Sequence, residues 1–325
     1  MPEEDKPNSD HNSTAKPATT PNQENISQLK VLLSGYITGC ITRTLIHSID
    51  TTKARLQVMK SKLSLSEFSK TGFTRTLVNT YKQEGIRGLY RGLGISVLAG
   101  GPATALYFYT YDRSKNYLSS LTKTQNSFWV LFTSGIIAEI CSCVLWVPID
   151  VIKERQQVMT LLKTYHYSSS IDAIRQIHAT EGIPALYRAY GATILTFGPF
   201  TGISLALYDK LKQWFGFTHG QQTFAQSVLL SGISGVVASI VTNPVDVVKV
   251  RMQVQRAESK GQDPSHGRFG YRNSFQGMVK LFGNEGFFGL FRGLFARMLF
   301  GTMSAALHLP INDFVKYKLL KNAKF

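Results

Sequence analysis

The chain has 325 residues, of which 43% are hydrophobic, and a formal net charge of +16. That charge suggests a polyanionic partner, which means nucleic acid or an anionic membrane surface. The sequence contains no Walker loop, Rossmann fingerprint or nucleophile elbow, and its scattered histidines have no metal-ligand spacing. We therefore expect neither an enzyme nor a bound metal or cofactor.

The chain begins with a polar segment that is rich in Asn, Ser, Thr and Pro. This composition predicts a disordered tail over residues 1–27. The segment has neither the apolar core of a signal peptide nor the Arg-rich, acid-poor face of a transit peptide. If the protein enters an organelle, we expect its targeting information in the segments that follow.

Six apolar segments come next, separated by basic stretches. They cover residues 31–49, 95–111, 128–149, 192–208, 226–245 and 294–311. Each is about as long as a helix needs to cross a bilayer, roughly 17–25 residues. An even number of crossings puts both termini on one side, so we expect an all-α membrane protein. The cysteines Cys40, Cys141 and Cys143 lie inside these segments, which favours packing residues over disulfides or a zinc site.

Three sequence signals recur along the chain in the same order. The first is HSIDTTKARLQV, VPIDVIKERQQV and NPVDVVKVRMQV, and the second is EGIRGLYRG, EGIPALYRA and EGFFGLFRG. The third is YDRSK, YDKLK and NDFVK. They predict three repeats, 28–120, 121–218 and 219–325. In each repeat we expect a long helix, a polar connector, a short amphipathic helix ending at a Glu-Gly pair and a second long helix. The short helices are predicted near 72–84, 168–181 and 272–285.

The first long helix of each repeat carries an acid and a lysine three residues apart. These pairs are Asp50/Lys53, Asp150/Lys153 and Asp246/Lys249. Residues at that spacing share a helix face, so repeats arranged in a ring would place each acid beside the lysine of another repeat. Isolated charges at membrane depth are costly, which makes pairing the expected outcome. Glutamines four residues beyond each lysine could hydrogen-bond across the pairs: Gln57, Gln157 and Gln253.

The second long helices end with a matching set of charges: Asp112/Lys115, Asp209/Lys212 and Asp313/Lys316. A single pair of this kind would be read as solvated charges at a helix end. Recurrence in three repeats instead predicts a second ring. Two rings that close opposite ends of a cavity describe an alternating-access gate, because forming one offsets the cost of breaking the other.

These motifs identify a resemblance to the mitochondrial carrier family. The tripled Pro-x-Asp/Glu-x-x-Lys/Arg-x-Arg-x-Gln motif carries it, and it covers residues ~28–318. It implies a six-helix pseudo-threefold bundle in the mitochondrial inner membrane, monomeric, with both termini toward the intermembrane space. The first charge ring then becomes a matrix gate and the second a cytoplasmic gate. Ser48 replaces the first motif proline, and Asn312 replaces an aromatic residue before Asp313.

The resemblance also implies cardiolipin bound at the matrix surface. The matching turns contain Arg91-Gly92 and Arg292-Gly293, where helix N-termini could supply amide donors to a phosphate. Ala189 replaces the glycine in the second repeat.

By family register, the substrate would contact residues that line the middle of the cavity. These positions are Arg43, Glu139, Cys143, Ser239, Ala99, Thr196, Phe197, Gly301 and Thr302. A lone arginine at this depth indicates function, although a structural pairing of Arg43 with Glu139 is the alternative. Together the two side chains would suit a zwitterion or a solute with separate anionic and cationic groups.

The most detailed of these predictions concerns the substrate, which depends on the group of carriers that the chain resembles. Residues 138–156 are similar to the third helix of S-adenosylmethionine carriers, although Trp146 stands where those carriers tend to have arginine. The RRRMMM signature of adenine nucleotide carriers is absent. An iron carrier stays an alternative, although the His and Met residues form no convincing constellation in the cavity. The main hypothesis is exchange of a small hydrophilic metabolite. The rival hypotheses are a transport-inactive structural subunit of a membrane complex and a basic soluble nucleic-acid binder, for which no reading element is present.

Overall fold

The computed structural model describes residues 21–59, 70–122, 128–163, 166–216, 223–255 and 269–321, and within these ranges it contains helices and no strand. The all-α prediction is therefore confirmed. The helices are α1 (Pro21–Val58), α3 (Lys70–Leu89), α4 (Leu93–Thr122), α5 (Phe128–Leu162), α6 (Ser170–Glu181), the 3₁₀ turn η1 (Ile183–Tyr187), α7 (Tyr190–Trp214), α8 (Phe224–Val254), α9 (Ser274–Gly289) and α10 (Leu294–Lys321).

The long helices follow one another around a closed ring. In chain order α1, α4, α5, α7, α8 and α10 each pack against the next, and α10 packs against α1. The first long helices of the repeats, α1, α5 and α8, also contact one another. Their mutual contact matters for function, because these three helices carry the first set of predicted charge pairs.

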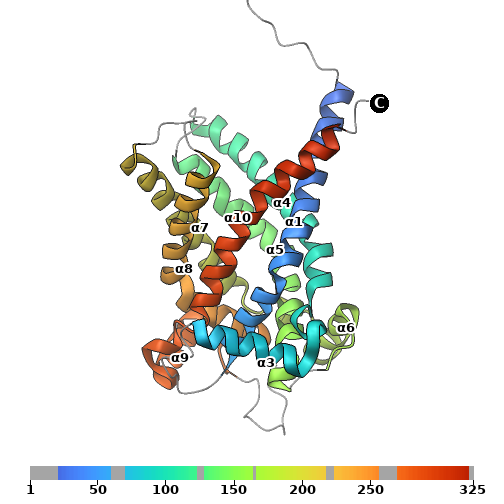
Figure 1. Ribbon diagram of the computed structural model, residues 1–325, viewed down its shortest axis with the longest axis vertical. Helices are drawn as coiled ribbons and strands as arrows, with labels where there is room; N and C mark the ends of the chain where they lie inside the picture. The colour runs from blue at the N-terminus through green and yellow to red at the C-terminus, as the bar shows by residue number, and fades with distance from the viewer. Residues whose placement is uncertain are drawn as a thin grey trace, which may run out of the picture.

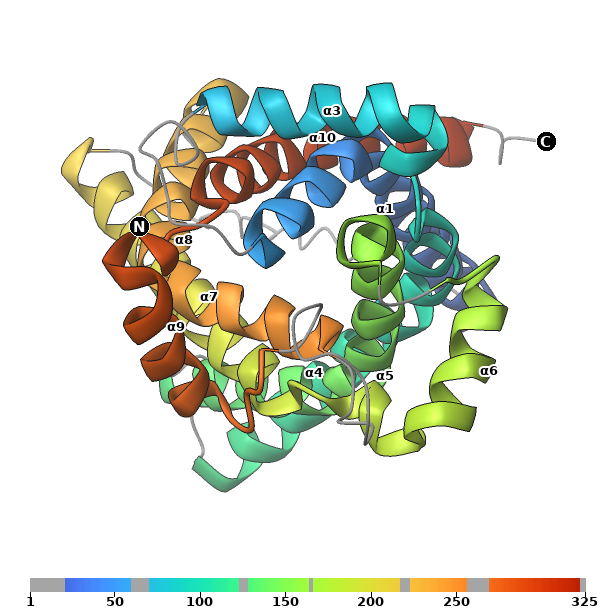
Figure 2. The same ribbon diagram turned by 90° about the horizontal axis from the view of Figure 1, so that it is seen from below.

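The short helices α3, α6 and α9 lie together at one end of the molecule, outside the long helices (Figures 1 and 2). A glycine with positive φ stands at each predicted Glu-Gly pair: Gly85 (65°) inside α3, Gly182 (77°) directly after α6 and Gly286 (72°) inside α9. A residue with a side chain is strained in this conformation, so glycine suits the abrupt change of direction at these three points.

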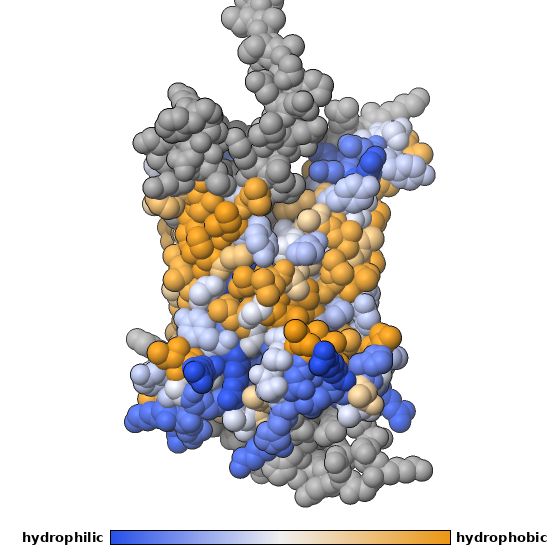
Figure 3. Space-filling view, turned by 90° about the vertical axis from the view of Figure 1, so that its right-hand side faces the viewer, coloured by the Kyte–Doolittle hydropathy of each residue, from blue (hydrophilic) through white to orange (hydrophobic). Residues whose placement is uncertain are grey.

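The outer surface is suited to a lipid environment. Figure 3 shows apolar residues forming a broad band between more hydrophilic ends. Large exposed side chains that contribute to the apolar surface include Leu98, Trp129, Leu195 and Leu229. Among the described residues, three helices are long and apolar enough to cross a membrane: Trp129–Leu162, Ile183–Trp214 and Ala225–Val254. An apolar surface this continuous marks contact with a membrane.

The start of the first helix differs from the sequence prediction. Helix α1 begins at Pro21, so residues 21–27, which the sequence placed in the tail, are helical in the structure. The remainder of the predicted tail, residues 1–20, lies outside the described residues. A polar composition lowers helix propensity only slightly per residue, and continuity with the long apolar helix that follows outweighs it.

Candidate functional site

Ion pairs join the first long helices at the end that carries α3, α6 and α9. Each connects a lysine of one repeat to an aspartate of another, as the ring arrangement predicts. The pairs are Lys153 Nζ–Asp50 Oδ2 (3.0 Å), Lys249 Nζ–Asp150 Oδ2 (3.0 Å) and Lys53 Nζ–Asp246 Oδ2 (2.9 Å). We call this set the ion-pair ring. It links α1, α5 and α8 to one another, so ion pairs join all three repeats at this end of the bundle.

The glutamines brace this ring unequally. The Gln57 amide donates to Asp246 Oδ2 at 2.8 Å, and the Gln157 amide donates to Asp50 Oδ2 at 3.3 Å. The Gln253 side chain is buried and forms no hydrogen bond within the described part of the chain. Two of the three glutamines thus hydrogen-bond to ring aspartates, while the Gln253 amide does not bond to Asp150 in this arrangement.

An arginine that the sequence analysis did not select strengthens one arm of the ring. Arg297 on α10 lies with Nε 3.6 Å from Asp246 Oδ2, and its Nη2 donates to Thr242 at 2.7 Å. Its guanidinium also faces the Phe200 ring, 5.7 Å from the centroid. Arg297 is a lone arginine inside a predicted apolar segment. The same observation had identified Arg43 as a candidate, so the sequence could have indicated Arg297 as well.

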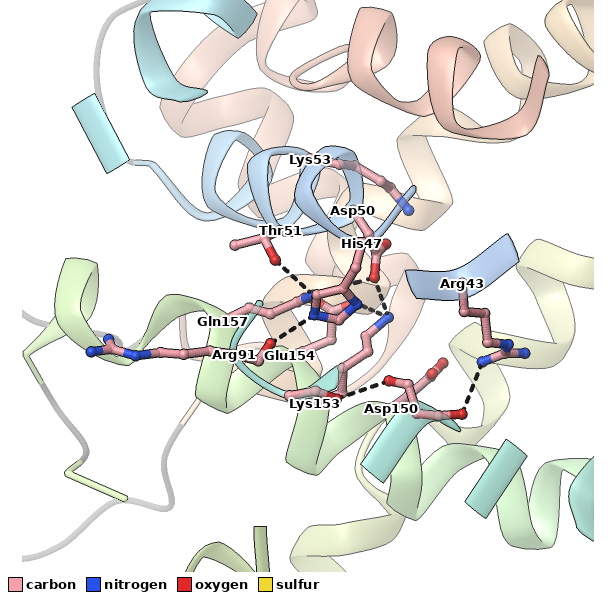
Figure 4. Close-up of polar contacts among 12 residues, drawn as sticks. Arg43, His47, Asp50, Thr51, Lys53, Arg91, Asp150, Lys153, Glu154 and Gln157 are labelled. Atoms are coloured by element: carbon pink, nitrogen blue, oxygen red, sulfur yellow. Dashed lines mark hydrogen bonds and ion pairs between the residues drawn. The ribbon is translucent and has the colours of Figure 1, made fainter. Parts of the chain in front are cut away.

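The arm at Asp50 carries two further titratable side chains that sequence analysis missed (Figure 4). The buried His47 ring has its Nε2 2.9 Å from the Arg91 carbonyl oxygen and stacks near Tyr90. Glu154, also buried, has Oε1 3.3 Å from Lys153 Nζ. Lys153 therefore contacts two carboxylates, Asp50 and Glu154, whereas each of the other ring lysines has one carboxylate partner within ion-pair distance in the described chain.

A second layer of charge lies close to the ring, and it repeats uniformly. A buried arginine on each first long helix pairs with the glutamate of the Glu-Gly motif in its own repeat. These pairs are Arg55–Glu84 (2.5 Å), Arg155–Glu181 (2.5 Å) and Arg251–Glu285 (2.6 Å). The Nε of each arginine donates to a glutamine carbonyl of another repeat, namely Gln157, Gln253 and Gln57 in the same order. We call this set the arginine layer.

The arginine layer ties the short helices to the bundle. Burial raises the pKa of the Glu84 carboxyl, but hydrogen bonds and charge from Arg55 outweigh it and hold that pKa below its ordinary value. The Glu84 carboxyl is therefore ionised at neutral pH. Breaking a buried ion pair by removing one partner typically costs about 3–5 kcal/mol, although Glu84 would keep Arg91 at 2.7 Å if Arg55 were lost.

The turns predicted to bind lipid adopt left-handed backbone conformations. Gly92 has φ 79° and Gly293 has φ 71°, and Ala189 takes φ 77° at the equivalent position. The side chain of Arg91 pairs with Glu84 at 2.7 Å, and that of Arg292 pairs with Glu285 at 3.2 Å. Both arginine side chains are thus engaged within the protein.

The predicted substrate residues Arg43 and Glu139 do not pair with each other. The Arg43 guanidinium lies over the Trp146 ring, 4.5 Å from its centroid, and its Nη1 is 3.4 Å from the Ser96 carbonyl oxygen. Glu139 accepts a weak hydrogen bond from Cys143 Sγ at 3.5 Å. Among the described residues, no ion pair connects Arg43 to Glu139.

The other predicted substrate residues differ in exposure. Cys143, Ser239 and Thr196 are buried, and the Thr196 hydroxyl donates to the Ala192 carbonyl of its own helix. Ala99 and Gly301 are partly buried, and Thr302 is exposed. Phe197 is partly exposed, with the Lys249 ammonium 4.6 Å from its ring centroid. The structure therefore places Phe197 directly beside the ion-pair ring.

The second predicted charge set lies at the opposite ends of α4, α7 and α10. Asp112 is exposed and Lys115 is partly exposed, and neither forms an ion pair within the described residues. Lys212, in the last turn of α7, is partly exposed. Three side chains of the set lie outside the described residues, namely those of Asp209, Asp313 and Lys316.

The second ring therefore stays a prediction, in contrast to the first. The structure places Lys212 at the expected end of its helix, but the side chain of its expected partner Asp209 is not described, so the Asp209/Lys212 pair is untested. At Asp112 and Lys115 the described chain has no counterpart of the pairs that close the other end.

A ring of long helices, an apolar outer band and inter-repeat ion pairs at one end define a membrane transporter of the solute carrier class. The family model described as "Mitochondrial carrier protein" matches the chain over residues 24–121, 124–219 and 220–323. The chain belongs to the mitochondrial carrier family, as the motifs in its sequence indicated, and its members are transporters.

Several curated relatives match nearly the whole chain. An S-adenosylmethionine mitochondrial carrier protein homolog from Drosophila melanogaster is 31% identical, covering 90% of this chain and 94% of the relative. Mitochondrial substrate carrier family protein E from Dictyostelium discoideum is also 31% identical, over 90% and 96%. Human Mitoferrin-1 is 26% identical, over 89% and 83%. The named solutes differ among these relatives, so similarity alone leaves the substrate undefined.

Proposed function

We propose that this protein moves a small hydrophilic metabolite across the mitochondrial inner membrane by alternating access. The observation that carries the proposal is the ion-pair ring, which links all three repeats at one end of the bundle. The predicted second charge set at the other end would close in its turn. Pseudo-threefold placement of the repeats would let each ring form as a unit, and the gain from one would offset the loss of the other.

The orientation follows from the family expectation. The ion-pair ring and the short helices would face the matrix, and both termini would face the intermembrane space. Cardiolipin would bind at the matrix surface through backbone amides of the turns at Gly92 and Gly293, since the neighbouring arginine side chains are engaged elsewhere. A monomer suffices for this mechanism, because one chain supplies all three pairs of the ring.

The substrate we favour carries both anionic and cationic groups and a flat ring, as S-adenosylmethionine does. Arg43 would hold a carboxylate, while the Trp146 ring already in contact with Arg43 offers a face for stacking. Glu139, which has no cationic partner within ion-pair distance in the described chain, would meet the positive groups. The Drosophila relative supports this substrate class.

A ligand screen followed by transport measurement tests the proposal. Detergent-purified protein is heated with S-adenosylmethionine, amino acids, nucleotides and glutathione, because a ligand that binds only the folded state raises the unfolding temperature. We expect a concentration-dependent rise with S-adenosylmethionine, and uptake of that compound into liposomes that contain the protein.

Two outcomes would overturn parts of the proposal. A shift and uptake with a different compound would replace S-adenosylmethionine and leave the transport mechanism in place. No shift and no uptake across the panel, together with co-purification in a large complex, would favour the structural-subunit hypothesis.

A further inference from the structure

Repeat 2 contains a buried carboxylate that the other repeats lack. Glu154 follows the ring lysine Lys153, and the equivalent residues in the other repeats are Ala54 and Val250. Both of those side chains are buried in the main apolar cluster. Glu154 is only 5% exposed, so the chain has placed an acid at a position that the other two repeats use for apolar packing.

The surroundings of Glu154 leave its charge poorly compensated. Lys153 Nζ is 3.0 Å from Asp50 Oδ2 and 3.3 Å from Glu154 Oε1, so one ammonium serves two carboxylates. Asp50 also accepts the Gln157 amide at 3.3 Å. In contrast, the second oxygen of Glu154, Oε2, is buried without any hydrogen-bond partner in the described chain. An ionised carboxylate in that position would leave lone pairs unsatisfied, at a cost of several kcal/mol.

The other charges near Glu154 do not relieve it. Those that face it are Lys153 and Asp150 from its own helix, and Asp50 and Lys53 from α1. Lys53 is already paired with Asp246 at 2.9 Å, and Asp150 with Lys249 at 3.0 Å. His47 lies on the Asp50 side of the cluster, where its Nε2 faces the Arg91 carbonyl. Two carboxylates that share one cation in a dry site favour a state in which one of them holds a proton.

We propose that Glu154 is a proton-binding site of this carrier, protonated at its carboxyl group while the ion-pair ring is closed. The proposal rests on the gating role assigned to the ring under Proposed function. When the ring opens, water reaches Glu154, and the carboxylic acid transfers its proton to water and becomes a hydrated carboxylate. When the ring closes again, the carboxylate takes one proton from water on the same side.

The consequence is a link between proton concentration and gating. Because the closed ring binds one proton more than the open ring, acid on that side favours closure and alkali favours opening. Neither of the other repeats can contribute this effect, since the equivalent side chains of Ala54 and Val250 do not titrate.

Infrared spectroscopy of the purified, detergent-solubilised full-length protein tests the site without any substrate. A protonated carboxylic acid has a C=O stretching band that a carboxylate lacks. We expect this band at neutral pH in the wild type and its loss in Glu154→Gln. The control is Asp172→Asn on α6, where hydrogen bonds from the Ser168 backbone, Gln176 and the Ser168 hydroxyl hold the pKa of Asp172 below its ordinary value. That variant should leave the band unchanged.

A second measurement uses the same proteins. The unfolding temperature of the wild type should fall as pH is raised from mildly acidic to mildly alkaline, and Glu154→Gln should lose this component. If Glu154→Gln fails to fold, Glu154→Asp keeps an acid at the site and should shift the band. An identical carboxylic-acid band in wild type and Glu154→Gln would overturn the proposal. If the protein takes up substrate but shows no carboxylic-acid band, only the proton site is rejected. If the band is present but no substrate is taken up, only the transport proposal is rejected.

Discussion

Two layers of charge lie at the same end of the molecule, and they differ in how faithfully they repeat. The arginine layer repeats its main contacts in all three repeats: a buried arginine pairs with one glutamate, and its Nε donates to a glutamine carbonyl of another repeat. The ion-pair ring varies: Asp246 has Lys53, Gln57 and Arg297 within reach, while the described contacts of Asp150 include neither a glutamine nor an arginine within ion-pair distance. The uniform layer is suited to holding the fold, and the variable ring is suited to opening.

The largest expected effect breaks the uniform layer. Arg155→Ala removes a side chain that is 0% exposed and leaves the buried Glu181 with Arg188, at 3.3 Å, as its remaining ion-pair partner. Because the closest cation of a buried carboxylate is lost, we expect a loss of up to about 3–5 kcal/mol of folding free energy, measured as failure to purify a cooperatively unfolding protein. Arg75→Ala, at an exposed position on α3, is the control and should unfold as the wild type does. A stable Arg155→Ala protein would remove the structural role from this layer.

Breaking the ring should instead affect transport. Lys153→Ala leaves Asp50 with the Gln157 amide and without its cation. We expect uptake into liposomes to fall about tenfold or more, since about 1.4 kcal/mol in the balance of two states is a factor of ten. The double exchange Asp50→Lys with Lys153→Asp should restore part of it. Normal transport by Lys153→Ala would contradict the matrix gate.

Gln57 hydrogen-bonds to a ring aspartate and Gln253 does not, so substitutions at these two positions form a matched pair. Gln57→Ala removes a hydrogen bond to the charged Asp246, worth about 1.5–3 kcal/mol to the closed ring. Gln253→Ala removes a side chain with no hydrogen bond in the described chain. Unfolding temperatures of the closed form should fall clearly for Gln57→Ala and much less for Gln253→Ala. Equal falls would mean that all three arms are braced alike.

The smallest effect concerns the turn that links the short helix of repeat 2 to α7. Ala189 holds φ 77°, which is unfavourable for a residue with a Cβ. Ala189→Gly should raise the unfolding free energy by less than about 1 kcal/mol, since relief of strain exceeds the added chain entropy. Gly92→Ala is the converse, because its Cβ would lie 3.1 Å from the Lys153 carbonyl oxygen. Destabilisation by Ala189→Gly would show that the buried methyl group outweighs the strain.

Sequence analysis predicted the features that recur and missed those that occur once. Helices, repeats and the lysine–aspartate pairing followed from tripled motifs. Glu154 was missed because its counterparts are Ala54 and Val250, and Arg297 because its counterparts are Ser96 and Thr193. Whether a glutamine contacts its aspartate depends on small rotations of the helices, and residue spacing does not predict these rotations. Sequence analysis therefore expected Gln253 to act as Gln57 does.

The hydrogen bonds of the arginine layer form a closed circuit, so the packing of the repeats does not depend on which repeat comes first in the chain. Arg55 bonds to repeat 2, Arg155 to repeat 3 and Arg251 back to repeat 1, so no repeat is first or last in space. Helix α10 packs on α1, which completes the same circuit in the long helices. A circular permutant that begins at α5 and joins α10 to α1 through a flexible linker would cut only one connection between repeats. Such a chain keeps every inter-repeat bond described above, and it should fold to the same bundle.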